Sequence, residues 1–291
     1  MGKAWFAVWA SLLWVGACVQ AAESLDAGSA AGQPAAVRSL GLDGAPNFRD
    51  IGGYASSDGR HVRWGRVFRS SELSKLTPGD QRKVAGLGLV AVIDLRTQEE
   101  RDRSPSAWLE RPADAYQSPK PSLTPVMSAI LKDAGTPDGA RAGIEGFYTQ
   151  MPDAYRDEYA AFFHRIAAGE VPILIHCSAG KDRTGLAIAV LLATLRVPRG
   201  TIMADYALTE TLVPALPRQA PGALAAAGQA AHGVGQLPEA SQRVLWRSDP
   251  RYLAAALRSI DREYGSIEGY VRNGLHVSEQ EEAALRKALL D

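Results

Sequence analysis

The feature that most constrains the fold is a pair of apolar segments joined by a short polar turn that contains glycine. Residues 171–175 (Val-Pro-Ile-Leu-Ile) form a continuous apolar run, which is typical of a strand covered on both faces. Residues 185–195 are also strongly apolar and long enough to predict a buried helix. The turn between them, residues 176–184, then connects the end of a strand to the start of a helix. Together they predict a βα unit of the kind that can cradle a phosphate group.

The rest of the chain predicts an α/β fold in which a central, mostly parallel sheet is flanked by helices. Further strands are expected at residues 62–70 and 89–95. Residues 105–143 carry many Pro, Gly and Ser residues around one apolar patch, and we expect a lid insertion with a short helix there rather than core. A helix is expected to begin after the N-cap Thr77, and Ser278 with Glu281 predicts a capping box. The other expected helices span residues 152–168, 185–195, 201–212, 250–264, 266–272 and 278–290.

Cys177 stands where the expected strand ends, just before the N-terminus of the expected helix. The partial positive charge of a helix N-terminus stabilises a thiolate, which is a nucleophile toward phosphorus. The backbone N–H groups of Ser178, Ala179 and Gly180 can wrap a tetrahedral dianion, and glycine lets the backbone come close to it. Residues 176–184 therefore predict a phosphate-binding loop around a cysteine nucleophile.

The remaining side chains of this loop suit the same chemistry. Arg183 offers a planar fork that matches two phosphate oxygens. The Thr184 hydroxyl can stabilise the sulfur when it becomes the leaving group, and His176 is expected to hold the loop backbone in shape. For Lys181 two interpretations stay open: it contacts additional phosphate groups, or it is a solvated loop lysine.

The motif His-Cys-x-Ala-Gly-Lys-Asp-Arg-Thr-Gly at residues 176–185 resembles the active-site loop of the bacterial tyrosine-protein phosphatase family. This is the broad-specificity branch of the cysteine-dependent protein tyrosine phosphatase superfamily. Residues 47–54 (Asn-Phe-Arg-Asp-Ile-Gly-Gly-Tyr), 66–73 and 94–96 are similar to three further signatures of that family, in the same order. The resemblance extends from about residue 40 to the last residue. It implies a protein tyrosine phosphatase-like fold with C-terminal helices. No glycine-rich nucleotide fingerprint and no metal-binding cluster of carboxylates or histidines is visible in the sequence, so we expect no cofactor or metal. The resemblance also implies hydrolysis of phosphotyrosine through a phosphocysteine intermediate, in some members with activity on phosphoserine, phosphothreonine or phosphoinositides.

A general acid must protonate the leaving oxygen, and two carboxylates are candidates. Asp182 lies inside the loop, whereas Asp94 lies at the C-terminal end of an expected parallel strand, where sites of α/β proteins gather. The position of Asp94 favours it slightly. Arg49, Asp50 and Arg96 either shape the pocket or form an ion-pair network that holds the N-terminal loop against the sheet.

Three other functions are weighed against a protein phosphatase. A sulfurtransferase also uses a cysteine after a strand, but Arg183 followed by Thr184 favours phosphate chemistry. A phosphate-binding module without activity is disfavoured because Cys177 and Arg183 are both intact. An inositol phosphate phosphatase of the phytase type remains the alternative within phosphatases. Lys and Arg (32) balance Asp and Glu (32), so the net charge gives no reason to expect a nucleic-acid partner.

The N-terminus predicts export. A lysine at position 3 is followed by an uncharged apolar stretch at residues 4–17, which fits a signal peptide that ends at residue 21. Residues 22–44 are rich in Ala, Gly and Ser and are expected to be a flexible linker to a phosphatase domain at 45–291. Cleavage before Cys18, as in a bacterial lipoprotein, is the alternative. We expect a periplasmic or secreted protein that meets a membrane only if Cys18 carries lipid.

Overall fold

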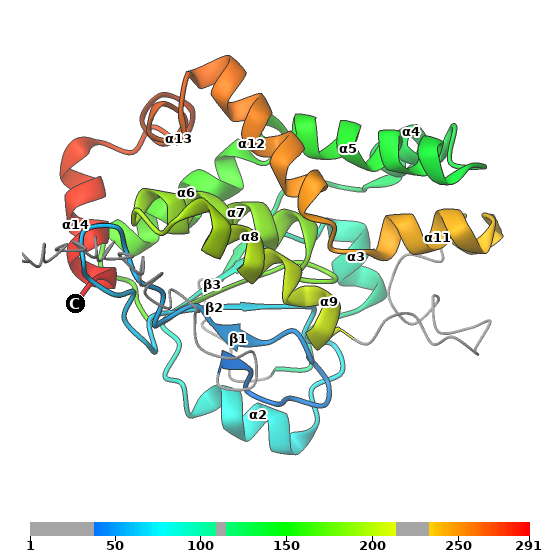
Figure 1. Ribbon diagram of the computed structural model, residues 1–291. Helices are drawn as coiled ribbons and strands as arrows, with labels where there is room; N and C mark the ends of the chain where they lie inside the picture. The colour runs from blue at the N-terminus through cyan, green and yellow to red at the C-terminus, as the bar shows by residue number, and fades with distance from the viewer. Residues whose placement is uncertain (1–37, 109–114, 214–232) are drawn as a thin grey trace, which may run out of the picture. The chain divides into compact units, whose positions relative to one another are not determined.

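The structure, a computed structural model, describes residues 38–108, 115–213 and 233–291 (Figure 1). The expected signal peptide and most of the expected linker lie outside these ranges. The last linker residues are described, and among them Arg38 and Leu42 are buried. Arg38 stacks on the Tyr54 ring at 3.5 Å from its centroid. The packed part of the chain therefore begins before residue 45.

A five-stranded, mostly parallel sheet lies at the centre of the described residues, as the sequence predicts. The strand order is β1-β2-β5-β3-β4, with β2, β5, β3 and β4 parallel and β1 antiparallel to β2 at the edge. The strands are β1 (Arg49–Asp50), β2 (Val67–Ser70), β3 (Ala91–Asp94), β4 (Tyr116–Gln117) and β5 (Ile173–His176). The two-residue strand β4 was not predicted, because it lies in the Pro-rich segment expected to be a lid.

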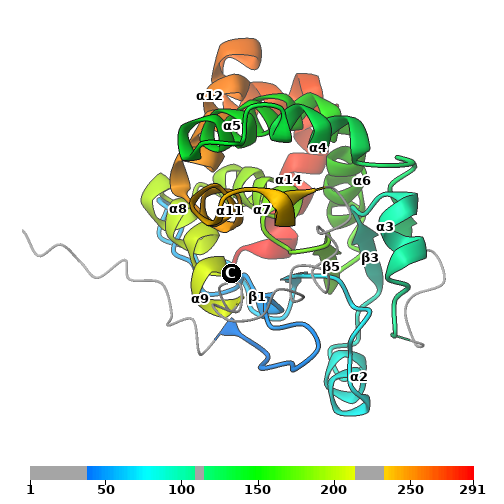
Figure 2. The ribbon, with the colours of Figure 1, turned by 90° about the vertical axis from the view of Figure 1, so that its right-hand side faces the viewer.

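Helices cover both faces of this sheet (Figures 1 and 2). They are α2 (Pro78–Ala85), α3 (Gln98–Arg103), α4 (Thr124–Leu131), α5 (Pro137–Ala154), α6 (Arg156–Ala167), α7 (Asp182–Thr194), α8 (Arg199–Ala207), α9 (Thr209–Leu212), α11 (Glu239–Trp246), α12 (Pro250–Tyr264), α13 (Ile267–Gly269) and α14 (Glu279–Leu289), with the short turns η2 (Val234–Gln236) and η3 (Tyr270–Gly274). None of the helices in the described ranges is long and apolar enough to cross a membrane.

The central strands send alternate side chains into two separate cores. Ile93 and Ile175 point into the large core, which includes the apolar faces of α5, α6 and α7. Val92 and Leu174 point to the other face, into a smaller core that α2 covers through Val84. In Figure 1, α2 lies below the sheet, and α6 and α7 lie above it. The same alternation determines which face of the sheet the side chains at the ends of the strands point to.

Sequence expectations about the helices are confirmed in part. Thr77 caps α2, and Ser278 forms the expected capping box at the start of α14. Residues 105–143 are not only a lid, because α5 begins inside them and buries Ile144, Tyr148 and Met151 further along its length. The single helix expected at 152–168 is interrupted at Tyr155, where α5 ends and α6 begins. Helix α11 was not predicted.

Candidate active site

Cys177 lies at the junction that the sequence predicts, one residue after β5 and five residues before α7. Its side chain is 1% exposed. Nearly every residue of α7 is buried, so the core fixes this helix and, with it, the loop at its N-terminus. The N–H groups of the first turn of α7 have no partner within the helix, so they are directed toward the loop.

The loop keeps its shape through glycine and through donors that approach it from behind. Gly180 has a φ of +65°, and a Cβ at this position would lie 2.3 Å from the carbonyl oxygen of Ser70. Asn47 Nδ2 donates to the carbonyl oxygens of Ala179 (3.0 Å) and Gly180 (3.1 Å). Arg69 Nη2 also donates to Gly180 O, at 2.8 Å. Because these carbonyl groups are engaged, the loop N–H groups remain to meet an anion.

The Arg183 guanidinium is held by both carboxylate oxygens of Glu100, at 2.7 and 2.8 Å. Arg183 Nη1 also donates to the carbonyl oxygen of Leu95 (3.0 Å), and Ser178 Oγ donates to Glu100 at 2.5 Å. Burial alone would raise the pKa of Glu100, but the charge and hydrogen bonds of Arg183 outweigh it and lower that pKa to about 2. Sequence reasoning missed Glu100. The signal was available, since Thr97 and Glu100 form the capping box of α3.

A second buried ion-pair network supports the loop from the β1 side. Asp205 on α8 accepts from Arg49 Nε (3.3 Å) and from Arg69 Nη1 (2.6 Å). Burial opposes ionisation of Asp205, but the two arginines lower its pKa to about 2. Of the two interpretations that the sequence left open for Arg49, the structure supports the second: Arg49 belongs to the ion-pair network and does not line the pocket. Asp205 was missed as well, and nothing in its local sequence marks it.

Asp50 does not reach this loop. Its carboxylate accepts from the backbone N–H groups of Gly52 (2.7 Å) and Gly65 (2.6 Å), which fixes the turn after β1. Burial raises its pKa above the usual value. Asp50 therefore holds the backbone and is not part of the phosphate site.

Asp94 and Asp182, the two candidate acids, have different surroundings. Asp94 accepts from Arg96 Nε (3.0 Å) and Arg96 Nη2 (2.8 Å). Burial disfavours its charged form, but His176 and then Arg96 lower the pKa of Asp94 below its usual value. Strand alternation places Asp94 on the sheet face of Val92, where it lines a hollow of about 240 Å³ beside His176 and away from the core that contains Cys177.

Asp182, in contrast, lies in the loop itself, at the first position of α7. Its carboxylate accepts from the Tyr148 hydroxyl at 2.6 Å, and its side chain is 15% exposed. Tyr148 in turn lies 2.6 Å from the Tyr206 hydroxyl. This chain of hydroxyl groups orients a carboxylate that solvent and substrate can reach. These surroundings favour Asp182 as the general acid, whereas strand position favoured Asp94.

His176 and Thr184 are both buried beside the cysteine loop. Burial lowers the pKa of His176 to about 4 even though Asp94 acts to raise it, so the imidazole is neutral near pH 7. The ring is neutral and buried, but its Nδ1 has no hydrogen-bond partner among the described residues, so its role in holding the loop backbone stays a prediction. The Thr184 hydroxyl is also buried and has no hydrogen-bond partner among the described residues.

Lys181 is buried and is not a solvated lysine. Its ammonium donates to the backbone carbonyl oxygen of Leu245 at 2.8 Å and lies 3.3 Å from that of Arg247, at the C-terminal end of α11. It also pairs with Asp182 at 3.3 Å. The negative end of a helix dipole favours a cation at this position. The interpretation of Lys181 as a solvated lysine is therefore wrong, because it connects the loop to α11, whereas its contact with additional phosphate groups stays a prediction.

Within the described ranges, no group of three His, Cys, Asp or Glu side chains is arranged to hold a metal ion. The chemistry that the site offers comes from a thiol, a fixed guanidinium, backbone donors and a reachable carboxylate. These are the groups that phosphoryl transfer through a cysteine requires.

Comparison with known proteins agrees with this arrangement. A family model described as the tyrosine phosphatase family matches residues 40–291. The chain is 33% identical over 244 residues to a Cupriavidus necator protein whose name assigns it provisionally to the tyrosine-protein phosphatases; the match covers 82% of this chain and 84% of that one. It is 33% identical to the triple specificity protein phosphatase PtpB of Mycobacterium tuberculosis (80% and 92% covered) and 31% identical to a tyrosine-protein phosphatase of Nostoc commune (76% and 73%). The chain belongs to the tyrosine phosphatase family.

Proposed function

We propose that this protein is a tyrosine-protein phosphatase that works through a phosphocysteine intermediate on Cys177. The observation that carries the proposal is the bidentate Arg183–Glu100 pair beside a cysteine at the N-terminus of α7. Glu100 fixes the guanidinium plane, so binding a phosphate does not require Arg183 to lose rotamer freedom. The similarity to named tyrosine-protein phosphatases supports the same reaction.

In the first step, the Cys177 thiolate attacks phosphorus. The S–P bond forms while the bond between phosphorus and the phenolic oxygen breaks. Arg183 and the loop N–H groups bind the equatorial oxygens as charge develops on them. Asp182 gives its proton to the leaving oxygen.

In the second step, water hydrolyses the phosphocysteine. Asp182, now a carboxylate, takes a proton from the water as its oxygen bonds to phosphorus and the S–P bond breaks. The Thr184 hydroxyl has no hydrogen-bond partner among the described residues, so it is available to donate to the departing sulfur. Phosphate leaves, and the thiolate is restored.

Substrates other than phosphotyrosine are a further part of the proposal. One relative is named a triple specificity phosphatase, which supports additional activity on phosphoserine and phosphothreonine. A substrate with several phosphate groups, such as a phosphoinositide or phytate, has less support. The Lys181 ammonium, for which contact with additional phosphates was one of two open interpretations, is engaged by a backbone carbonyl group of α11.

The test is phosphate release by the reduced protein from phosphotyrosine peptide, phosphoserine peptide, phosphatidylinositol phosphate vesicles and phytate. We expect the phosphotyrosine peptide to be the best substrate and Cys177→Ser to be inactive. Arg183→Lys is the matched variant, because it keeps the charge and removes the fork. Folded protein that releases phosphate from none of the four substrates would refute the proposal and favour a binding module.

We also propose export, on the sequence of residues 1–21 alone. Mass spectrometry of the mature N-terminus distinguishes the two forms of processing. A chain that begins at Ala22 indicates a signal peptidase, whereas a lipid-modified chain that begins at Cys18 indicates a lipoprotein. An unprocessed N-terminus in a native bacterial host would contradict both.

A further inference from the structure

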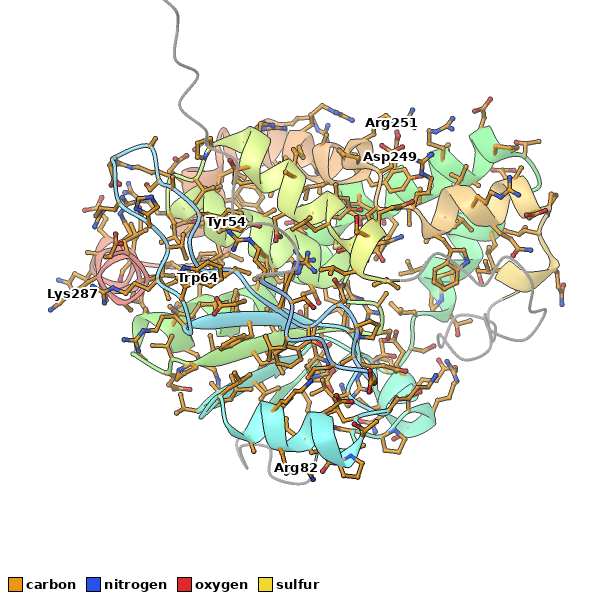
Figure 3. The ribbon with its side chains drawn as sticks, turned by 60° about the horizontal axis from the view of Figure 1, so that its bottom comes forward. Tyr54, Trp64, Arg82, Asp249, Arg251 and Lys287 are labelled. Carbon is orange, nitrogen blue, oxygen red and sulfur yellow. The ribbon has the colours of Figure 1, made fainter. Side chains whose placement is uncertain are left out.

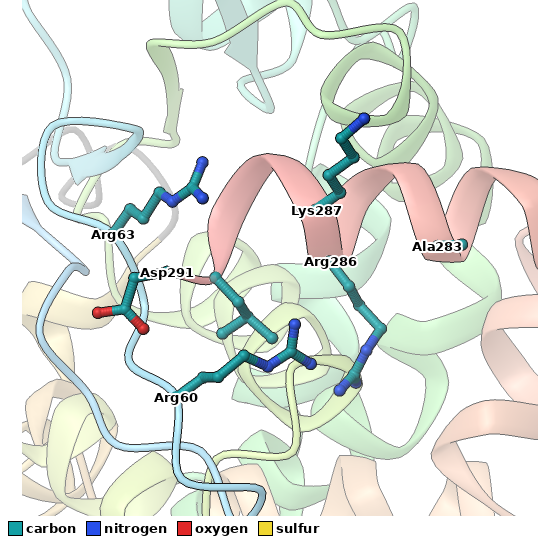
Figure 4. A pocket seen from close by; sticks show the side chains of 7 residues that line it. Arg60, Arg63, Ala283, Arg286, Lys287 and Asp291 are labelled. Carbon is teal, nitrogen blue, oxygen red and sulfur yellow. The ribbon is translucent and has the colours of Figure 1, made fainter.

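A positively charged hollow lies between α14 and the loop that follows β1. Its volume is about 460 Å³. Arg60 and Arg63 reach it from the loop, and Arg286 and Lys287 reach it from the last turns of α14 (Figure 4). Asp291 contributes a carboxylate to the same wall.

Two of the four cations have no counter-charge in the described part of the chain. Asp58 pairs with Arg60 at 2.7 Å and with Arg286 at 3.0 Å. Arg63 and Lys287 make no ion pair with any described residue, and the Asp291 carboxylate accepts from the backbone N–H of His61 (2.7 Å). Four cations thus face two side-chain carboxylates, which leaves an excess of positive charge.

The crowding of cations is visible at Arg286. Burial lowers its pKa below the usual value, and the charges of Arg196 and Arg60 lower it further, while Asp58 and Glu282 act in the opposite direction. Like charges that are held this close repel one another, and a bound anion would relieve the repulsion.

The dipole of α14 explains only part of this cluster. A helix C-terminus favours cations, which accounts for Arg286 and Lys287. Arg60 and Arg63 come from a different segment, and backbone hydrogen bonds fix that segment against the helix end. Arg63 N–H donates to Leu289 O (2.7 Å), and Asp291 N–H donates to His61 O (3.1 Å). The cations are therefore presented by a fixed backbone rather than by one mobile surface helix.

We propose that this hollow is a second anion site that binds a group carrying more than one phosphate. A phosphate bears a charge of about −1.5 to −2 near pH 7 and matches the arginine fork, so Arg63 suits one phosphate and Lys287 adds a second positive charge to the lining of the same hollow. An adjacent hollow of about 490 Å³ shares Arg63 and adds Arg66 and the 42% exposed Trp64. It offers room and a cation for a second phosphate. Trp64 and Lys287 are both labelled in Figure 3.

The site is separate from the catalytic loop. Helix α7 begins in that loop at Asp182, and the carbonyl oxygen of its last residue, Thr194, accepts from Arg286 Nη1 at 2.7 Å. Thirteen helical residues span about 20 Å, so one molecule of inositol-phosphate size cannot occupy both places. The proposal therefore does not depend on the substrate of Cys177.

Calorimetric titration with myo-inositol hexakisphosphate tests the proposal, with orthovanadate present to block the catalytic loop. Arg63→Ala/Lys287→Ala removes the two unpaired cations. Arg82→Ala/Lys132→Ala removes one arginine and one lysine from exposed positions on α2 and after α4, and is the matched control. Hydrolysis of a phosphotyrosine peptide is measured in parallel on all three proteins.

We expect Arg63→Ala/Lys287→Ala, called the hollow variant, to bind myo-inositol hexakisphosphate about tenfold more weakly than the control variant. Both variants should hydrolyse the phosphotyrosine peptide at an unchanged rate. Retention on phosphatidylcholine vesicles that contain phosphatidylinositol bisphosphate identifies the source of the phosphates. Retention lost in the hollow variant indicates a lipid headgroup, and binding of the soluble ligand without retention indicates a free phosphate compound. Equal binding by the two variants, or no binding beyond the blocked loop, would overturn the proposal. Failure of hydrolysis alone would count only against the proposed function.

Discussion

Arg183 and Glu100 meet through two parallel hydrogen bonds, at 2.7 and 2.8 Å, although 83 residues separate them in the chain. Glu100 is fixed at the other end as well, because its carboxylate accepts the N–H of Thr97 at 2.8 Å and so caps α3. The first turn of α3 therefore sets the orientation of the guanidinium that would bind phosphate. A helix that covers one side of the sheet contributes directly to the geometry of the loop after β5.

Replacing Glu100 with Gln should lower kcat/KM by about tenfold to a hundredfold, because a neutral amide cannot hold both donors of Arg183. The free energy of unfolding should also fall, by about 3–5 kcal/mol if the buried cation is left without a counter-charge. Steady-state kinetics on a phosphotyrosine peptide and urea unfolding measure the two effects. Glu99→Gln, at the half-buried neighbouring position that does not contact Arg183, is the control and should leave kcat/KM unchanged and stability nearly so. Equal kinetics in the two variants would mean that Arg183 needs no partner.

The general acid can be identified from the leaving group. Asp182→Asn should lower kcat/KM, which reports the steps up to phosphocysteine formation, by about a hundredfold or more on a phosphotyrosine peptide, whose phenolate must be protonated. The loss should shrink on an aryl phosphate with a strongly acidic leaving group, which departs without a proton. A purely structural role of Asp182 would reduce both rates alike.

Asp94→Asn is the matched comparison for that experiment. It breaks the buried pair with Arg96 and should lower stability without any dependence on the leaving group. A leaving-group effect in Asp94→Asn and none in Asp182→Asn would restore the preference that strand position alone suggested.

The parts of the site that lie close together in sequence could be predicted, and the parts assembled by the fold could not. Cys177, Gly180 and Arg183 share one loop, so their spacing is enough to predict a phosphate cradle. Asp205 reaches the loop only through the packing of α8 against the sheet, and its local sequence is unremarkable. The solvated interpretation of Lys181 failed for the same reason, because the carbonyl group that binds it belongs to α11, which was not predicted.

The same reasoning explains the outcome for the fold. Apolar runs and caps predicted β3, β5, α2 and α7 within a few residues, because the residues that signal burial and capping are neighbours in the sequence. The edge strand β4 has two residues and no pattern of its own, so only its pairing with β3 makes it a strand. The face of the sheet on which Asp94 lies also depends on the pairing register of β3, which cannot be inferred from the local sequence.

Gly180→Ala should abolish activity, with a loss of at least about a hundredfold in kcat/KM. The added Cβ would lie 2.3 Å from Ser70 O, so the loop must move away from β2. Gly88→Ala is a matched control: its φ is +61°, close to that of Gly180, but nothing lies within 4 Å of its Cβ. Both variants carry the same backbone strain, and only one carries the clash. If both lose activity equally in the peptide assay, strain rather than contact with β2 explains the requirement for glycine.

His176 should make stability depend on pH in a defined window. Its pKa is about 4 in the folded protein and 6.5 when it is free of the fold. Between these two pH values His176 binds a proton in the unfolded chain but not in the folded protein. The free energy of unfolding therefore falls as the pH drops below 6.5, and above pH 6.5 His176 does not change it. At about pH 5 the contribution is on the order of 2 kcal/mol. Glu100 and Asp205, with pKa values of about 2, lose their stabilising effect only below about pH 4.5, outside most of this window.

Urea unfolding near pH 5 and near pH 7 measures this contribution. We expect the difference between the two pH values to shrink by about 2 kcal/mol in His176→Asn, because the variant has no imidazole to protonate in the unfolded chain. His61→Asn, at an exposed position, should keep the wild-type difference. A wild-type difference that survives in His176→Asn would show that the ring is already protonated in the folded protein near pH 5, and the neutral role assigned to it beside Cys177 would be wrong.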